Sequence, residues 1–358
     1  MLHGRIMLET TGLPQIYVYL IDSTADSHNV IQTDASGEWS APVISGHKYV
    51  IRYHSSRYSF SQDTFVYENA AESTTVPTVT ATALFTDTAE TVVSEFTYEV
   101  LNGSYASITK YTGSSTNVVV PEKIDSYIVQ KIAQSAFANN KTLESLLLPE
   151  SVESIGDNAF GGCTSLSLIG FDDALTSIGD YAFSGCTGLT ELSLPDSIET
   201  IGGAAFYECS NLQNINIPLG WKEVGYRYSY GDGYIFLGCT KLTSITVPEG
   251  ITVLPDYAFR GCSSLTSISL PSTLTSIGSY AFSGCSGMSA ISIPDSVQSM
   301  GKSAFSGCTG LAGIEIPGEV TAIADNLFYG NTGLKNVTLS TKTKSIGDYA
   351  FSGCTGLT

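Results

Sequence analysis

The chain has 358 residues, of which 42% are apolar and 14% charged, and its formal net charge is -18. A chain of this length can bury the cores of two domains. So large a negative charge excludes nucleic acid as an expected partner, because phosphates would be repelled. No apolar run reaches the roughly 18 residues that a transmembrane helix needs, so we expect no membrane insertion.

Residues 1–82 carry short alternating apolar segments, such as QIYVYLI at 15–21 and KYVIRY at 48–53. Short strands at this spacing predict a β-sandwich. The segment TDASGEW at 33–39 is typical of a turn between two strands. We expect the side chain of Asp34 to cap this turn and Gly37 to adopt a positive φ.

This TDxxGxW turn and the GHKYVI segment at 46–51 resemble two kinds of module in bacterial surface proteins. These are the carboxypeptidase-regulatory-like and Cna-B-like sandwiches, with an Ig-like or prealbumin-like fold. The resemblance implies a spacer rather than an enzyme. Asp22, Asp26 and Asp34 could surround a calcium ion, but they do not meet the EF-hand pattern, so we expect turn caps and no metal.

Residues 83–94 are expected to be a linker, because the Ala- and Thr-rich stretch at 70–90 predicts a last strand followed by loose chain. The next segment, 95–120, is expected to be a capping hairpin for the repeats that follow. The chain therefore divides into a module at 1–82, a linker at 83–94 and a repeat array at 95–358. The repeat array and linker carry net charge -14 and the module -4.

A phenylalanine recurs ten times, and eight of the nine intervals are 23 residues while one is 30. The ten are Phe137, Phe160, Phe183, Phe206, Phe236, Phe259, Phe282, Phe305, Phe328 and Phe351. A fixed period of this size predicts a solenoid of about ten coils. The unit reads AFxxCxxLxxIxIPxxVxxIGxx, whose apolar spacing alternates between three and two. This spacing predicts a mainly β coil with short strands and short helical or 3-10 turns.

Proline and glycine each hold a fixed position in the unit. Proline follows the first strand, where its missing N–H ends the pairing, at Pro149, Pro195, Pro218, Pro248, Pro271, Pro294 and Pro317. Glycine follows the second apolar pair at Gly156, Gly179, Gly202, Gly225, Gly278, Gly301 and Gly347. We expect a corner with positive φ at this glycine.

All eight cysteines lie three residues after a repeat phenylalanine. They are Cys163, Cys186, Cys209, Cys239, Cys262, Cys285, Cys308 and Cys354, and the two other coils carry Asn140 and Asn331 there. Asparagine cannot replace half of a disulfide, whereas both side chains can hydrogen-bond a buried corner. We therefore predict a structural ladder, although the coil spacing alone also permits disulfides. Zinc is disfavoured, because no two cysteines lie closer than 23 residues.

Units such as LPDSIETIGGAAF at 194–206 resemble the leucine-rich repeats of BspA-like, or Treponema-pallidum-type, bacterial surface proteins. The resemblance covers about residues 95–358. It implies a curved solenoid outside a bacterial cell, and adhesion or binding to a host or microbial surface protein. The start of the chain lacks a signal peptide core and the end, at 354–358, falls within a coil, so we expect a fragment of a longer protein.

Catalytic motifs are missing from the repeat array. All four histidines, His3, His28, His47 and His54, precede residue 82, so a serine or cysteine nucleophile in the array has no imidazole base. There is no HExxH or GxSxG motif. Carboxylate pairs such as Asp172 and Asp173 could serve a hydrolase, but they are more simply a solvated face. We expect no enzyme activity and no cofactor.

The one long interval contains an insertion with the composition of a binding site. Its candidate ligand-binding residues are Tyr226, Arg227, Tyr228, Tyr230, Asp232 and Tyr234. Tyrosine and arginine give large contact areas with polar ends, which suits the recognition of proteins or sugars. Alternatively, some of these rings cover the flank of the solenoid. The neighbouring Trp221 occupies an apolar column and is expected in the core.

A second candidate surface is the outward column of the first strands, which is mostly small and polar. It consists of Leu147, Gly170, Ser193, Asn216, Thr246, Ser269, Ser292, Glu315 and Thr338. We therefore expect a non-enzymatic, extracellular bacterial protein that binds other proteins through the solenoid. The alternative function is a carbohydrate-binding module that attaches the cell to glycans.

Overall fold

The computed structural model describes residues 2–8, 11–12, 17–22, 27–44, 48–54, 58–61, 64–67, 74–84, 91–221, 223–225 and 233–358. The chain divides into two compact units, Met1–Thr88 and Ala89–Thr358, and the division falls within the segment 83–94. The described residues form strands and turns, with one 3-10 helix, η1 (Val93–Glu95). None of their helices is long and apolar enough to cross a bilayer.

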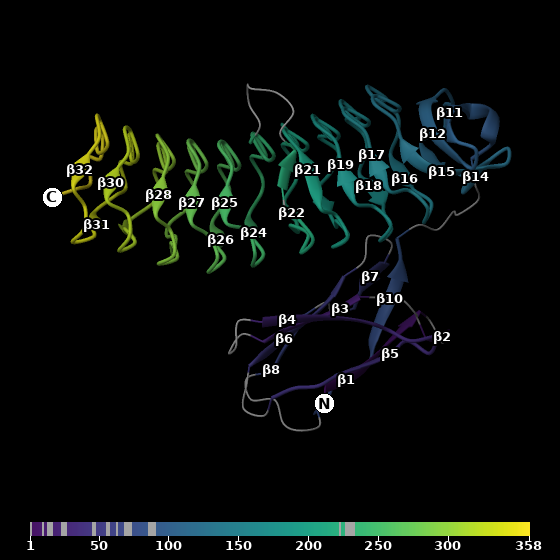
Figure 1. Ribbon diagram of the computed structural model, residues 1–358, viewed down its shortest axis with the longest axis horizontal. Coiled ribbons are helices and arrows are strands. Elements are labelled where there is room, and N and C mark those ends of the chain that lie inside the picture. The colour runs from purple at the N-terminus through teal and green to yellow at the C-terminus, as the bar shows by residue number, and fades with distance from the viewer. Residues whose placement is uncertain are drawn as a thin grey trace. The chain divides into compact units, whose positions relative to one another are not determined.

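The first unit contains two sheets (Figure 1). One contains β1 (Leu2–Leu8), β2 (Thr11–Gly12), β5 (Glu38–Ala41), β7 (Tyr58–Phe60), β9 (Thr74–Thr75) and β10 (Val79–Ala83). The other contains β3 (Tyr17–Asp22), β4 (Ser27–Gln32), β6 (Tyr49–His54) and β8 (Thr64–Tyr67). Both sheets contribute to one cluster of buried side chains, which includes Ile6, Leu20 and Ile51.

The predicted turn at 33–39 is confirmed. The carboxylate Oδ1 of Asp34 accepts hydrogen bonds from the N–H and Oγ of Ser36 and from the N–H of Glu38, at 2.7–3.0 Å. Gly37 has a φ of 75°. The Ser36 hydroxyl, followed by the N–H groups of Glu38 and Ser36, lowers the pKa of Asp34.

The second unit begins with an antiparallel hairpin of β11 (Phe96–Asn102) and β12 (Tyr105–Tyr111), and β12 then pairs in parallel with β15 (Tyr127–Ile132). The short strand β14 (Lys123–Ile124) also pairs with β15. From β15 to residue 225, each coil adds a short strand in parallel to the one before, as in the pairs Ser154 with Ser177 and Ile155 with Ile178. Further along the solenoid, the parallel pairing continues in separate, shorter sheets. Residues that lie 23 positions apart in the sequence therefore pair with each other in neighbouring coils.

Two columns of strands run along the solenoid (Figure 1). The first contains β13 (Asn117–Val119), β16 (Ser145–Leu147), β18 (Leu168–Gly170), β20 (Glu191–Leu192), β22 (Asn214–Ile215), β24 (Ser244–Thr246), β26 (Ser267–Ser269), β29 (Gly313–Glu315) and β31 (Asn336–Thr338). The second continues from β15 as β17 (Ser154–Ile155), β19 (Ser177–Ile178), β21 (Thr200–Gly202), β23 (Glu223–Gly225), β25 (Val253–Leu254), β27 (Ser276–Ile277), β28 (Ser299–Met300), β30 (Ala322–Ile323) and β32 (Ser345–Ile346).

The repeat phenylalanines form a continuous stack through the core. Neighbouring ring centroids are 5.1–5.9 Å apart. Tyr111 of the hairpin adds one more ring, 5.4 Å from Phe137. Every phenylalanine of the stack except Phe351 is at most 2% exposed. Each ring thus covers its neighbour, which one isolated coil could not do.

The expectation of positive φ at the recurring glycines is wrong. In the described coils positive φ occurs instead two residues before the phenylalanine, as at Asn158 (54°), and two residues after it, as at Gly162 (74°) and Gly185 (69°). Gly156 and its counterparts are glycines because the preceding coil comes too close for a side chain. A Cβ on Gly156 would lie 2.7 Å from the backbone nitrogen of Gln134. Close approach and positive φ both select glycine, and here they act at different positions.

Candidate functional site: a tyrosine row beside the insertion

Most of the predicted ligand-binding residues fall outside the described residues. These are Tyr226, Arg227, Tyr228, Tyr230 and Asp232. Tyr234 is described and is half-buried. The residues around Tyr234 therefore show what surface the solenoid offers next to the insertion.

The strand pairing of the second column stops next to the insertion, as it does again between β28 and β30, whereas the aromatic core is continuous. Phe206 and Phe236, on either side of it, stack at 5.5 Å with their planes only 6° apart. Within the described part of the chain, the sheet that starts at β11 ends at β23, and the next sheet of this column starts at β25. The core rings on either side of the insertion therefore keep the spacing of the other coils.

Pro255, which directly follows β25, is consistent with the missing strand pairing between β23 and β25. It occupies the position where other coils have a glycine whose N–H donates to the preceding strand, as Gly278 does to the carbonyl of Leu254 at 2.9 Å. Proline has no N–H, so this bond cannot form. The coil after the insertion is thus built without one of the bonds that join its neighbours.

Three tyrosines on consecutive coils form a row, which we call the tyrosine row: Tyr234, Tyr257 and Tyr280. The ring centroids of Tyr234 and Tyr257 are 4.4 Å apart, and those of Tyr257 and Tyr280 are 5.0 Å apart. The latter two planes differ by only 3°. All three side chains are half-buried, so each is partly accessible from solvent.

Arg260 completes the row. Its guanidinium carbon lies 5.6 Å from the ring centroids of both Tyr257 and Tyr280, and the residue is exposed. Cation–π contacts of this kind each contribute about 0.5–1 kcal/mol at an exposed site. Burial, and then the neighbouring Tyr234, raises the pKa of Tyr257, so its hydroxyl stays protonated at neutral pH.

The sequence reasoning missed Tyr257, Tyr280 and Arg260, although a signal was present. Five coils carry tyrosine two residues before the repeat phenylalanine: Tyr181, Tyr234, Tyr257, Tyr280 and Tyr349. The backbone there is left-handed, for example at Tyr257 (φ 62°) and Tyr280 (φ 57°). Asparagine, which tolerates this conformation well, fills the same position at Asn158 and Asn326. The repeated choice of tyrosine marks an additional column on the surface.

The eight cysteines are all buried and free. The Sγ atom of each donates to the carbonyl oxygen of the phenylalanine of the preceding coil, at 3.1–3.3 Å. Burial raises the pKa of Cys163 to about 11 and that of Cys308 to about 12. Of the asparagines in this column, Asn140 accepts from the N–H groups of Thr142 and Leu143, whereas Asn331 is fully buried.

The outward column of the first strands is less uniform than expected. Leu147 and Gly170 are buried, so they do not belong to an exposed surface, and burial is the usual state of a large aliphatic side chain such as Leu147. The amide of Asn216 bridges to the backbone N–H and carbonyl of Leu194 in the preceding coil, at 2.7 and 2.8 Å. The expectation for Trp221 is confirmed, since it is 6% exposed and belongs to the core.

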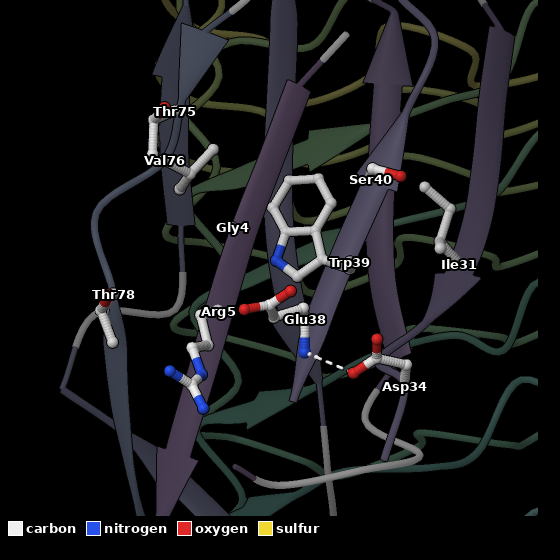
Figure 2. Close-up of a pocket in the computed structure, with 10 residues that line it drawn as sticks. All are labelled: Gly4, Arg5, Ile31, Asp34, Glu38, Trp39, Ser40, Thr75, Val76 and Thr78. Carbon is white, nitrogen blue, oxygen red and sulfur yellow. Dashed lines mark hydrogen bonds between the residues drawn. The ribbon is translucent and has the colours of Figure 1, made fainter. Parts of the chain in front are cut away.

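The first unit contains a cavity of about 550 Å³, beside the turn at 33–39. Figure 2 shows that Arg5, Asp34, Glu38 and Trp39 line it. The polar groups in view serve the fold, because Asp34 caps the turn and the Nε of Arg5 donates to the carbonyl of Ser36 at 3.1 Å. Among the described residues, no three His, Cys, Asp or Glu side chains gather as they would around a metal ion. The calcium alternative includes Asp26, which lies outside them.

The repeat geometry matches a known family over most of the chain. The model of the BspA type leucine rich repeat region matches residues 110–231 and 232–358. The chain belongs to this family. The BspA-type chain shares 31% sequence identity with a T. pallidum leucine-rich repeat protein of known crystal structure, and the two structures align with a TM-score of 0.51. The match covers 62% of this chain and 90% of the other.

Two further solved structures resemble the BspA-type chain at lower identity. One is a leucine-rich repeat protein from Bacteroides ovatus, 23% identical, with a TM-score of 0.41, covering 75% of this chain and 93% of the other. The second is a leucine rich cell surface protein from Faecalibacterium prausnitzii, 23% identical, with a TM-score of 0.34, covering 74% and 92%. No curated protein matches the BspA-type chain. The family fixes the solenoid fold but names no ligand.

Proposed function

We propose that the protein is a non-enzymatic bacterial surface or secreted protein that binds a host or microbial protein through its solenoid. Family membership supports the solenoid and the bacterial setting. In this proposal the first unit is a spacer, and the adhesive surface is the flank that carries the insertion and the tyrosine row.

The observation that carries the proposal is the stacking of Tyr234, Tyr257 and Tyr280 with Arg260 on consecutive coils. Tyrosine and arginine are the residue types enriched at the energetic centres of protein interfaces. Their side chains are already held by one another, so little conformational entropy remains to be lost on binding. The rigid phenylalanine stack beneath them fixes their spacing.

Carbohydrate binding, the alternative, is less well supported by this geometry. A sugar ring packs on an open aromatic face, whereas Tyr257 and Tyr280 are parallel and each covers part of the other's face. The guanidinium of Arg260 lies over both rings as well. The row therefore offers mutually stacked rings with phenol groups and a cation, which suits a polypeptide better than a neutral glycan.

The test measures binding of the intact chain to a panel of purified extracellular proteins and to a glycan array. The informative variant is Tyr257→Asn with Tyr280→Asn, because asparagine occupies this column naturally at Asn158 and Asn326. Tyr349→Asn is the matched control, since Tyr349 has the same left-handed backbone (φ 57°) but lies outside the row. We expect protein binding that the double variant weakens about tenfold or more and the control leaves unchanged. Binding that appears only on glycans would overturn the proposal.

A further inference from the structure

Arg260 is a singular feature of its column. The residue directly after the repeat phenylalanine is small, apolar or tyrosine in every other coil: Ala138, Gly161, Ser184, Tyr207, Leu237, Ser283, Ser306, Tyr329 and Ser352. No part of the coil therefore requires a cation at this point. In the one coil that has it, the flanking coils also supply the stacked rings of the tyrosine row.

The guanidinium of Arg260 contacts aromatic rings and, among the described residues, no carboxylate. It lies 5.6 Å from the centroids of both Tyr257 and Tyr280. No carboxylate of the described residues lies within 4 Å of the Arg260 guanidinium. Acidic residues outnumber basic ones by 34 to 16 in this chain. An exposed arginine with no carboxylate of the described residues beside it thus departs from the acidic composition of the chain.

The chemistry of a guanidinium defines what it binds. Its planar fork of N–H donors matches the two oxygens of a carboxylate, and such charge-assisted pairs are the stronger hydrogen bonds. The contacts with Tyr257 and Tyr280 restrict the orientation of the guanidinium before a partner binds. We infer that Arg260 is an anchor for a single aspartate or glutamate side chain of a partner protein, with the tyrosine row contacting the residues around it. This inference rests on the proposed function.

The charge of the chain limits the partner further. Linker and repeat array together carry net charge -14, which repels an extended polyanion such as a sulfated polysaccharide. One carboxylate surrounded by neutral, aromatic or basic residues escapes most of this repulsion. The ring edges and hydroxyls of the row suit such a segment, because they offer both apolar contact and hydrogen bonds.

The experiment uses a phage-displayed library of random peptides selected on the immobilised full chain. We expect enrichment of peptides with one conserved Asp or Glu among neutral or basic residues. Parallel selections use Arg260→Gln, Arg260→Lys and the matched control Tyr349→Asn. Peptides selected on Arg260→Gln are expected to show no conserved Asp or Glu. Conservation of the acid should be weaker on Arg260→Lys, because lysine keeps the charge but lacks the planar fork of donors. On the control, the acid should be conserved as on the parent chain.

Synthetic peptides then test the pair directly. A peptide carrying the conserved acid, and its Glu→Gln or Asp→Asn counterpart, are titrated against the parent chain and Arg260→Gln. On the parent we expect the amide peptide to bind about tenfold more weakly or worse, and on Arg260→Gln we expect the two peptides to bind equally. A carboxylate effect of the same size on both chains would overturn the inference, as would enrichment of purely basic peptides or preferential binding of heparin.

The proposed function and the carboxylate anchor can be refuted independently of each other. If the protein panel finds a partner that the Tyr257 and Tyr280 variant loses but Arg260→Gln retains, the proposed function stands and the carboxylate anchor does not. If no panel protein binds, while the peptide titration still couples Arg260 to an acid, the anchor stands and the adhesive function does not.

Discussion

The Sγ atom of Cys308 donates to the carbonyl oxygen of Phe282, 26 residues earlier, at a distance of 3.1 Å. The same bond occurs at each of the eight cysteines, so the thiols point toward the backbone of the preceding coil and not toward one another. The column thereby joins neighbouring coils through hydrogen bonds between side chain and backbone.

The first prediction concerns thiol reactivity. Burial raises the pKa of these thiols, to about 11 at Cys163 and about 12 at Cys308. The reactive thiolate is therefore scarce and inaccessible at pH 8. We expect Ellman's reagent to find at most the last-coil thiol, Cys354, in the native protein, and eight thiols after unfolding in guanidinium without reductant. A count near zero in the unfolded protein would mean that disulfides are present.

The second prediction uses the two asparagines of the cysteine column. Neither amide atom of Asn331 has a hydrogen-bond partner among the described residues, although the side chain is fully buried. An unsatisfied buried polar group costs about 1–3 kcal/mol, so Asn331→Cys is expected to raise the free energy of unfolding by a similar amount. Asn140→Cys is the control, because Oδ1 of Asn140 accepts three hydrogen bonds and its loss is destabilising. Urea titration followed by circular dichroism compares the two, and the same sign for both would contradict the reasoning.

The third prediction separates the two glycine columns. At Gly185, with φ 69°, alanine is expected to cost about 1–2 kcal/mol and asparagine less, since Asn139 has φ 60° in the same column. At Gly156, both substitutions are expected to cost about 1–3 kcal/mol, because the obstacle is the backbone of Gln134. Gly318→Ala is the control, since nothing lies within 4 Å of its Cβ position. Thermal unfolding measures all five variants, and rescue by asparagine at Gly156 would refute the distinction.

The fourth prediction concerns pH and the turn of the first unit. Hydrogen bonds to Ser36 and Glu38 hold the pKa of Asp34 below its ordinary value of 3.8. A carboxyl with a depressed folded pKa stabilises the fold above its unfolded pKa, and this contribution is lost as pH falls through the folded pKa. We expect Asp34→Asn to lower the stability of the first unit at pH 7, and the difference from the parent to shrink below pH 3.8. Ser36→Ala should move the Asp34 pKa, measured by NMR, back toward 3.8; an unchanged pKa would contradict the assigned cause.

The period of the phenylalanines was sufficient to predict the solenoid, because a strict 23-residue repeat leaves few ways to bury the same apolar columns. The turn at Asp34 and Gly37 was equally predictable, since its residue types act locally. The glycine columns were not, because a sequence does not tell whether a glycine is needed for its φ or for the approach of another coil. The structure separates these causes at Gly156 and Gly162.

The candidate site was only partly predictable for a related reason. The insertion drew attention to Tyr234, but the ring that it contacts, Tyr257, lies 23 residues further on, and Tyr280, which stacks on Tyr257, lies 46 residues further on. Their contact exists only because the coils stack in register. The position of Arg260 over both rings likewise depends on the left-handed corners at Tyr257 and Tyr280, where small or polar residues would be the ordinary choice.

The unbroken stacking of Phe206 on Phe236 has an evolutionary consequence. A coil that accepts seven additional residues while its core rings keep their spacing can change its length and composition independently of the core. Insertions can therefore be acquired one coil at a time without loss of the core, and under the proposed function this would let the same scaffold change its partner.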